Sequence, residues 1–216
     1  MIHFWDMDHT IINNDCDVSW KDFMIAKGLA PSSANDEADK FYQDYLNMCL
    51  DYNEFIQFQL REFQGKSPEE IDELSLEHFD KYVKDKIYPE AVKMIEAQKA
   101  SGEVVCLITA TNSYIAKPLA AYLGIPHILA TVPELADGTF TGNFVGEYCC
   151  GAGKVGYIKD FCEEQGLNFS EAKYYGDSNN DIPIFEALNH ACAVNPGEKL
   201  RAEAQANKWE ILDFSL

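Results

Sequence analysis

Short apolar runs that alternate with helical stretches are the feature that most limits the fold of this chain. The apolar runs are bounded by turn residues and lie at residues 2–5, 103–108, 127–130, 172–175 and 191–194. Stretches with apolar residues at helical spacing lie between the later runs, at residues 89–101, 113–123, 154–165 and 182–188. This alternation predicts βαβ units, and therefore an α/β fold with a doubly wound parallel sheet that is covered on both faces.

Two segments depart from the alternation. Residues 131–148 contain two alternating stretches around Asp137-Gly138, which is typical of a hairpin inserted in the pattern. Residues 13–86 have no strand-like run and carry aromatic residues at helical intervals, with Pro31 and Pro68 at helix boundaries. Aromatic residues at this spacing favour core packing over a ligand site.

The helical segment suggests a domain inserted after the first strand. We expect an α/β core domain made of residues 1–12 and 87–216, and an all-helical cap domain at residues 13–86. In an open α/β sheet, ligands bind outside the carboxyl ends of the strands. An insertion after the first strand would lie over that edge, which is the position of a lid.

The charge of the chain excludes several partners. It has 36 acidic and 17 basic residues, a formal net charge of −19, and Arg61 and Arg201 as its arginines. Binding to nucleic acid requires clustered Lys and Arg, and adhesion to an anionic membrane is disfavoured for the same reason. If the substrate is an anion, its site needs a local positive charge to offset the negative potential of the chain. A bound divalent cation would supply that charge.

The remaining composition predicts a cytoplasmic protein. No basic stretch leads into an apolar run at the start, so no signal peptide is expected, and no apolar segment is long enough for a membrane span. The seven cysteines are an odd number without a framework spacing, which favours buried, reduced thiols. The vicinal pair Cys149-Cys150 is a weaker indication of redox activity or metal binding.

The first strand ends in Asp6-Met7-Asp8, with two carboxylates at positions i and i+2. In an extended segment these side chains point the same way. Two like charges so close cannot both ionise freely, so one retains a proton or a cation neutralises them. The pair suits a nucleophile beside an acid/base group, although a polar strand end that faces water would look the same.

Three further signals follow other predicted strands or open a helix. Thr109 ends a strand before a helix and could help to hold an anion, or simply belong to a helix N-cap. Asp177 and Asp181 offer hard oxygen ligands suited to Mg²⁺. Lys154 opens a helix, where a cation is unfavourable unless its ammonium faces an anion. The G-x-G-x-x-G match at residues 151–156 follows a hairpin, which disfavours a dinucleotide site.

Together and in this order, the motifs resemble those of the haloacid dehalogenase superfamily of phosphohydrolases, and within it the phosphoserine-phosphatase-like branch (subfamily IB). The four matching motifs are Asp6-x-Asp8-x-Thr10, Thr109, Lys154 and Gly176-Asp177-x-x-x-Asp181. The resemblance covers essentially the whole chain and implies a Rossmann-like core with a helical cap. It also implies a Mg²⁺-dependent phosphatase that acts on a small phosphorylated metabolite.

The resemblance assigns a role to each residue of the core. Asp6 would attack phosphorus to give an aspartyl-phosphate, and Asp8 would protonate the leaving oxygen and then activate water. Asp6, Asp177 and the backbone carbonyl of Asp8 would bind Mg²⁺. Thr109 and Lys154 would bind the phosphoryl oxygens. Asp181 would fix Lys154, and Asn180 would face the phosphate or a metal-bound water.

The substrate must be inferred from the cap. By resemblance to phosphoserine phosphatases, Asp15 would take a substrate ammonium and Arg61 a carboxylate, although a surface ion pair of Arg61 with Glu62 or a neighbouring acid is slightly favoured over that contact. Histidinol phosphate or phosphocholine-type esters are equally compatible with an acidic, aromatic cap. His9 is either a leaving-group contact or a turn residue. A phosphotransferase with the same intermediate, or a phosphate-sensing module without turnover, would be the other functions to test.

Overall fold

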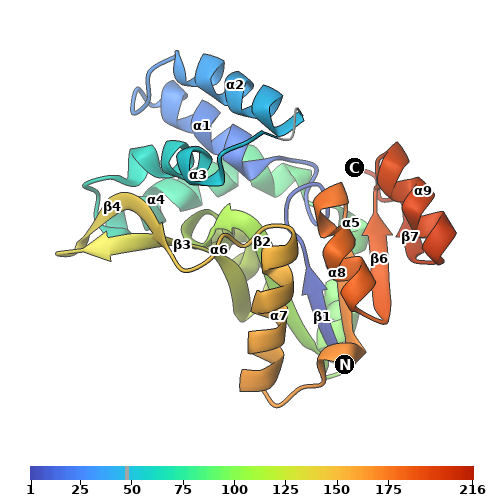
Figure 1. Ribbon diagram of the computed structural model, residues 1–216. Helices are drawn as coiled ribbons and strands as arrows, with labels where there is room; N and C mark the ends of the chain where they lie inside the picture. Colours follow the sequence, from blue (N-terminus) through green and yellow to red (C-terminus); the bar gives the residue numbers. More distant parts are fainter. Residues whose placement is uncertain (47–48) are drawn as a thin grey trace.

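The computed structural model describes residues 1–46 and 49–216, and its centre is a seven-stranded sheet with the order β4-β3-β2-β1-β5-β6-β7. All neighbouring strands are parallel except β3 and β4 (Figure 1). The strands are β1 (Ile2–Trp5), β2 (Val104–Asn112), β3 (His127–Ala136), β4 (Thr139–Val145), β5 (Ala172–Gly176), β6 (His190–Val194) and β7 (Glu210–Leu212). The predicted α/β fold with a mostly parallel sheet is therefore confirmed.

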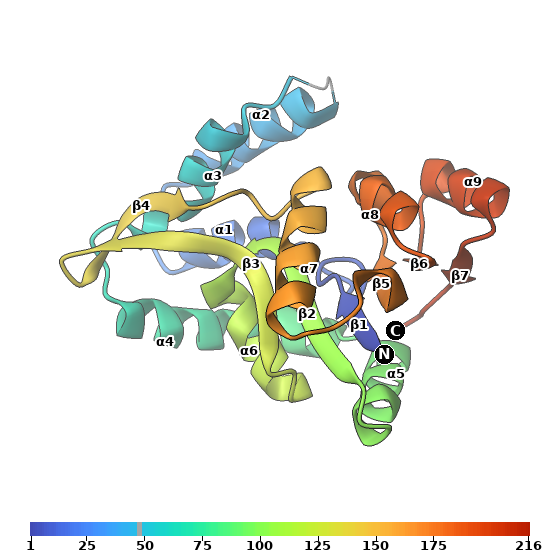
Figure 2. The same ribbon diagram turned by 60° about the horizontal axis from the view of Figure 1, so that its bottom comes forward.

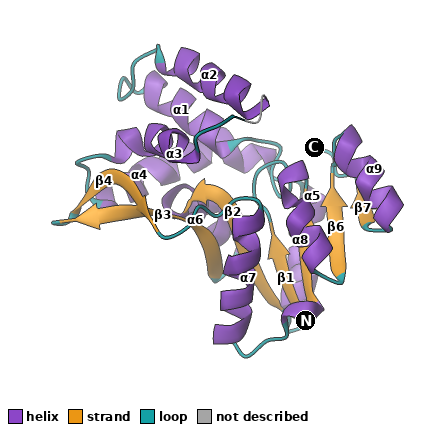
Figure 3. Ribbon diagram, in the orientation of Figure 1, coloured by secondary structure: helices purple, strands orange, loops and turns teal. Residues whose placement is uncertain are grey.

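Helices cover both faces of the sheet (Figure 3). They are α5 (Pro89–Ala100), α6 (Ser113–Leu123), α7 (Ala152–Glu164), α8 (Ile182–Ala187) and α9 (Glu198–Asn207). Along β1, Phe4 packs in one core with α7, α8 and α9, and Trp5 packs in the other with α5 and α6. Burial on both faces explains why the strands are continuously apolar in the sequence.

A helical region lies between β1 and α5 and covers one end of the sheet (Figures 1 and 2). It contains α1 (Cys16–Ala26), α2 (Ala34–Leu46), α3 (Tyr52–Leu60), α4 (Pro68–His78) and a π-helical turn (Phe79–Val83). Local signals begin these helices: the Asp15 carboxylate accepts from the Val18 N–H, and Ser67 and Glu70 form a capping box ahead of α4. Shorter 3₁₀ turns occupy Arg61–Phe63, Lys84–Lys86, Phe169–Glu171 and Asn179–Asp181.

The aromatic residues of this region divide into two groups. Trp20, Phe23 and Phe63 are buried, and the Trp20 ring lies 5.6 Å from each of the other two, between centroids. The core packing of Trp20 and Phe23 is the one that their helical spacing predicts. A second group faces a cavity above the sheet instead and includes Phe41, Phe55 and Phe58. Periodicity indicates which side of a helix is apolar, but it does not distinguish a core from a cavity wall.

The predicted hairpin is present and packs against the helical region. β3 and β4 pair in antiparallel fashion around Asp137-Gly138, and both turn residues have positive φ. Phe140 of β4 packs edge-on against Phe63, with ring centroids 5.3 Å apart, and its carbonyl accepts from the Gly65 N–H. The hairpin thereby joins the sheet to the helical region.

Differences from the sequence prediction lie at the ends of elements and at the edge of the sheet. β2 and β3 extend to residues 112 and 136, beyond the predicted ends at 108 and 130, and α9 and β7 were not predicted. No helix in the described part of the chain combines the length and apolar character needed to cross a bilayer.

Candidate active site

The candidate site lies where β2, β1 and β5, three adjacent parallel strands, end at the same edge of the sheet. Asp6 directly follows β1, Thr109 lies near the end of β2 and Asp177 directly follows β5. Because parallel strands present their carboxyl ends at one edge, these residues meet there. A cavity of about 380 Å³ lies above them, lined by the sheet edge on one side and by α1, α2 and α3 on the other.

Lys154, in the first turn of α7, is the centre of the polar network. Its ammonium lies 2.9 Å from the Asp6 carboxylate and 3.1 Å from that of Asp181, and it donates to the Tyr174 hydroxyl at 2.9 Å. Burial opposes the charge, but Asp181 and Asp6 outweigh it and raise the pKa of Lys154 above its ordinary value. The lysine is therefore a buried cation held in place by three partners.

Asp6 is 8% exposed and accepts from the Met7 N–H at 2.8 Å in addition to its contact with Lys154. Burial raises the pKa of Asp6 to about 6, although the Lys154 ammonium opposes this shift. One face of its carboxylate is thus fixed by donors while the residue lines the cavity. A carboxylate oriented in this way is suited to attack an electrophile that enters the cavity.

Asp8 is held by different donors. Its carboxylate accepts from the Cys16 N–H and from the Thr111 hydroxyl, both at 2.8 Å. Burial, followed by the charges of Asp15, Asp17 and Asp6, raises the pKa of Asp8 well above its ordinary value, while Thr111 opposes the rise. A neutral carboxylic acid at the cavity wall can donate a proton.

Thr111 is a functional candidate that the sequence prediction missed. It is 2% exposed and lies two residues after Thr109 in the same strand. Thr109-x-Thr111 and Asp6-x-Asp8 have the same i, i+2 spacing, which in an extended segment points both side chains of a pair the same way. That shared spacing was a signal that could have identified Thr111.

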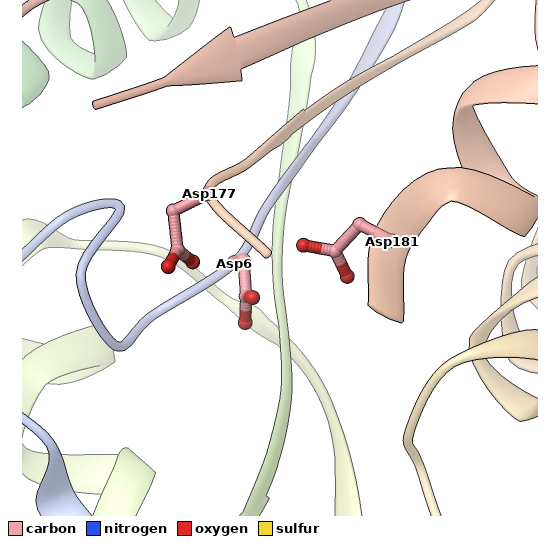
Figure 4. Close-up of side chains that lie close together, drawn as sticks. All are labelled: Asp6, Asp177 and Asp181. Carbon is pink, nitrogen blue, oxygen red and sulfur yellow. The ribbon is translucent and has the colours of Figure 1, made fainter. Parts of the chain in front are cut away.

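Three carboxylates at this edge could hold a metal ion. Ligand oxygens of Asp6, Asp177 and Asp181 all lie within 4.8 Å of one another. Figure 4 shows Asp6 on the segment after β1, with Asp177 and Asp181 on the segment after β5. Burial, together with the charges of Asp6 and Asp181, raises the pKa of Asp177, whose carboxylate also accepts from the Thr10 hydroxyl at 3.1 Å. Oxygen donors in this number fit a hard divalent cation, which would offset their repulsion.

The predicted metal set and the observed cluster differ in one member. The cluster is made of side-chain oxygens and contains Asp181, whereas the predicted third ligand is the backbone carbonyl of Asp8, which such a cluster neither includes nor excludes. One oxygen of Asp181 is already shared by Lys154 and by the Tyr174 hydroxyl, which donates to it at 2.7 Å. The contact between Asp181 and Lys154 is the one that the sequence analysis expected.

Two predicted phosphate ligands also lie at the cavity. Thr109 is 1% exposed, and its hydroxyl oxygen accepts from the Thr111 N–H at 3.1 Å. Asn180 is half-buried and also lines the cavity, from the 3₁₀ turn that precedes α8. The structure therefore places both residues beside the cavity that Asp6 and Lys154 line.

Of the two predicted cap residues, Asp15 lines the cavity and Arg61 does not. Asp15 lines the cavity as the N-cap of α1. Arg61 is not among the residues that line it, because its guanidinium forms two hydrogen bonds with Glu37, at 2.9 and 2.6 Å, on the outside of the cap. The alternative of a surface ion pair is thus the observed one, with Glu37 rather than Glu62 as the partner.

Three further residues at the cavity, Lys21, Asp17 and Gln59, were not predicted as part of the site. Lys21 of α1 is buried and pairs with Glu62 at 2.5 Å, while Asp17 and Gln59 line the cavity from α1 and α3. His9 lines it as an exposed turn residue with φ +55°. Cys150 also lines the cavity, Cys149 is buried beside it, and all seven cysteines are free thiols.

Comparison with known proteins identifies the family. The model of haloacid dehalogenase-like hydrolases matches residues 3–186. The chain belongs to this family. It is a phosphatase of the phosphoserine-phosphatase-like branch, as its motifs predicted.

Two relatives of this haloacid dehalogenase-like phosphatase carry the names of different phosphatases. It is 32% identical over 215 residues to a histidinol-phosphatase of Neisseria meningitidis serogroup C, and the match covers 97% of each chain. It is 37% identical over 153 residues to phosphoserine phosphatase SerB1 of Mycobacterium tuberculosis, which covers 71% of this chain. That match spans only 50% of the mycobacterial protein.

Two solved structures share the fold of this chain. A Bordetella pertussis protein of unknown function superposes with a TM-score of 0.91 at 31% identity, covering 98% of this chain and 97% of that one. A substrate-bound phosphoserine phosphatase superposes with a TM-score of 0.70 at 17% identity, covering 98% of this chain and 91% of that one. The second similarity concerns the fold alone and supports the core with its helical cap region.

Proposed function

We propose that this protein is a Mg²⁺-dependent phosphatase that hydrolyses the phosphomonoester of a small amino alcohol without a carboxylate, of the histidinol phosphate type. The reaction would pass through an aspartyl-phosphate on Asp6. The observation that carries the proposal is the 2.9 Å contact between Asp6 and Lys154 at the base of a cavity whose cap side is acidic and aromatic.

In the first step, an Asp6 oxygen forms a bond to phosphorus while the bond from phosphorus to the leaving oxygen breaks. The Met7 N–H and Lys154 orient the attacking carboxylate. Lys154 also supplies positive charge to the phosphoryl oxygens, and Asp181 keeps that ammonium in position. Thr109 and Asn180 are the further phosphate-binding groups of the proposal.

Asp8 handles the proton in both steps. It gives its proton to the leaving alkoxide, and the resulting carboxylate takes a proton from the water that attacks phosphorus in the second step. Free phosphate then leaves and Asp6 is regenerated. The raised pKa of Asp8 supports the first of these roles, since the acid must be protonated when substrate binds.

Asp6 and Asp177, with the backbone carbonyl of Asp8, are the proposed Mg²⁺ ligands. Asp181 lies within reach, but its Lys154 and Tyr174 contacts favour a positioning role. When bound, the cation would neutralise carboxylate charge and polarise the phosphoryl oxygens. Without such a cation, a chain of net charge −19 would repel the phosphate group of its substrate.

The cavity between the core and the cap supports a small substrate. We place the core at residues 1–12 and 87–216 and the cap at residues 13–86, with the cavity between the two. A cap over the phosphate site excludes water before transfer. A cavity of about 380 Å³ is suited to a small metabolite rather than to a phosphoprotein.

The chemistry of the cap favours a cationic substrate without a carboxylate. Asp15 and Asp17 line the cavity and would attract an ammonium group, and aromatic side chains add cation-binding faces. Lys21 is already neutralised by Glu62, and Arg61 by Glu37. The carboxylate of phosphoserine would therefore face acids. The full-length similarity to a histidinol-phosphatase agrees with this interpretation.

Phosphoserine is the second candidate, because SerB1 and related proteins carry that name. The decisive experiment measures phosphate release from histidinol phosphate, phosphoserine and phosphocholine with Mg²⁺, with and without excess chelator. We expect the highest kcat/KM with histidinol phosphate, loss of turnover in chelator, and no turnover in Asp6→Asn. A preference for phosphoserine would overturn the substrate, and activity of Asp6→Asn would overturn the covalent mechanism.

Two controls complete this test. Arg61→Gln should leave kcat/KM unchanged for histidinol phosphate, since the guanidinium lies outside the cavity; a loss specific to phosphoserine would place Arg61 at the substrate. Added acceptor alcohols should not reduce the yield of free phosphate. If they do, the protein is a phosphotransferase with the same intermediate.

A further inference from the structure

A buried amide oxygen without a hydrogen-bond partner belongs to a residue that lines the cavity. Gln59, in the last turn of α3, is 9% exposed and lines the cavity. Its Oε1 is buried and makes no hydrogen bond in the described part of the chain. A buried amide is normally paired, so an unpaired one in a cavity wall indicates a group that pairs with a ligand.

Asp17 lies in the same wall, on α1. Lys21 attracts its carboxylate electrostatically, but the Lys21 ammonium is itself directed to Glu62 and to the Phe58 carbonyl. Burial, and next the charge of Asp15, raises the pKa of Asp17 to about 7. A ligand that brings an N–H donor or a positive charge would therefore stabilise the charged form of the Asp17 carboxylate.

The two residues also border a smaller pocket that adjoins the main cavity. Asp17 and Gln59 line both hollows, as do Phe55, Ala110 and Tyr148. Phe55 and Tyr148 provide flat aromatic surfaces at this junction. A planar ring could lie against them while its edge meets the carboxylate and the amide.

We propose that Asp17 and Gln59 determine specificity by binding the nitrogen heterocycle of the substrate at the end remote from the phosphate. This inference rests on the proposed function and names the part of the cap that selects the substrate. Asp17 accepts from one ring N–H, and Gln59, whose amide offers both a donor and an acceptor, pairs with the second ring nitrogen. Imidazole fits this pair in either protonation state.

Other substrate groups fit less well. A quaternary ammonium has no N–H, so it would leave Gln59 without a partner. A carboxylate could pair with the amide but would be repelled by Asp17 and Asp15. The subsite therefore discriminates among the amino-alcohol phosphates that the overall charge of the cap would admit.

The test compares two substrates in two variants of the full chain. Gln59→Leu and Asp17→Asn should each lower kcat/KM for histidinol phosphate by at least about tenfold, because a site built to hydrogen-bond a ligand discriminates strongly when one partner is removed. Turnover of p-nitrophenyl phosphate, whose ring has no N–H, should stay within about twofold in Gln59→Leu. Because the charge of Asp17 also raises the pKa of Asp8, Asp17→Asn is judged by the ratio of its kcat/KM values for the two substrates, which should fall at least about tenfold. Gln57→Leu and Asp22→Asn, exposed on the same helices, are matched controls that should change neither.

Thermal unfolding gives a second measurement for Gln59→Leu. Because the variant removes a buried amide without a hydrogen-bond partner, its Tm should rise while its specificity falls. A structural role for the amide would lower Tm and would impair both substrates alike, which would overturn the inference.

The outcomes separate the inference from the proposed function. If the parent hydrolyses histidinol phosphate and both variants retain their kcat/KM, the subsite is wrong and the phosphatase function stands. If the parent hydrolyses p-nitrophenyl phosphate but not histidinol phosphate, the proposed substrate is wrong and the inference fails with it.

Discussion

Lys154 holds Asp6 by a 2.9 Å ion pair between two buried side chains. The lysine comes from the first turn of α7 and the aspartate from the end of β1, so the contact joins segments that are 148 residues apart. Asp181 and Tyr174 bind the same ammonium from the other side. The cation is therefore in place before any phosphoryl group arrives, which is the preorganisation that electrostatic catalysis requires.

Removing this charge should disable the proposed reaction. Lys154→Met should reduce kcat/KM by about 100- to 1,000-fold, the loss typical of a preorganised charge-stabilising group. Steady-state phosphate release with saturating Mg²⁺ would measure it. Lys159→Met, exposed on the same helix, is the control. Retention of more than about a tenth of the parental rate would contradict the role of Lys154.

Thr111→Val should change the pH dependence of the reaction. The Thr111 hydroxyl donates to Asp8 at 2.8 Å and lowers its pKa, so its removal raises that pKa further. Asp8 would then stay protonated to a higher pH, and the alkaline limb of the kcat profile should move upward while kcat falls about tenfold. A profile of kcat against pH checks this, with Thr139→Val as control. An unshifted alkaline limb would mean that another group donates the proton.

The sequence predicted that the core residues lie together at one edge of the sheet, because these residues are tied to regular structure. Asp6, Thr109 and Asp177 belong to the ends of buried strands, which apolar runs indicate well, and a parallel sheet brings such ends together. α9 and β7 lacked comparable signals. The α9 sequence is mostly polar, and β7 is a short, partly exposed edge strand.

The side-chain contacts of the cap could not be predicted from the sequence in the same way. Whether Arg61 faces the cavity depends on how α2 lies against the turn at residues 61–63, which brings Glu37 to the guanidinium. Lys21 and Glu62 pair across 41 residues of sequence. Such contacts depend on the crossing of helices, which a periodic pattern leaves undetermined.

Two glycines in α7 provide a matched test of how Lys154 is positioned. A Cβ at Gly153 would lie 2.5 Å from the Tyr148 carbonyl oxygen, whereas a Cβ at Gly156 would have no neighbour within 4 Å. Gly153→Ala should displace the first turn of α7, lower kcat/KM about tenfold and destabilise the protein. Gly156→Ala should keep its activity. Its free energy of unfolding should rise by about 0.5–1 kcal/mol, because alanine has less backbone entropy than glycine in the unfolded chain. Assays of phosphate release and urea unfolding compare the two; equal activity would show that the close approach to Tyr148 does not position Lys154.

His78 should make the stability of this protein depend on pH. It is fully buried on α4, where its Nε2 lies 2.9 Å from the Ser19 hydroxyl, and burial followed by Lys86 lowers its pKa to about 4. Between pH 6.5 and 4, the unfolded chain binds a proton at this side chain that the folded chain excludes, so the free energy of unfolding falls as pH falls.

Between pH 7 and pH 4.5 this effect of His78 amounts to about 2 kcal/mol. His78→Gln removes the titration and can keep a hydrogen bond to Ser19, so its loss of stability over that interval should be smaller by this amount. Asp6 and Asp17, whose pKa values are raised, shift stability in the opposite sense, but they do so equally in both proteins and cancel in the comparison. Urea unfolding at the two pH values measures the difference, and His190→Gln, exposed on β6, should match the parent. Parallel pH dependence in parent and His78→Gln would mean that the buried imidazole is protonated in the folded state.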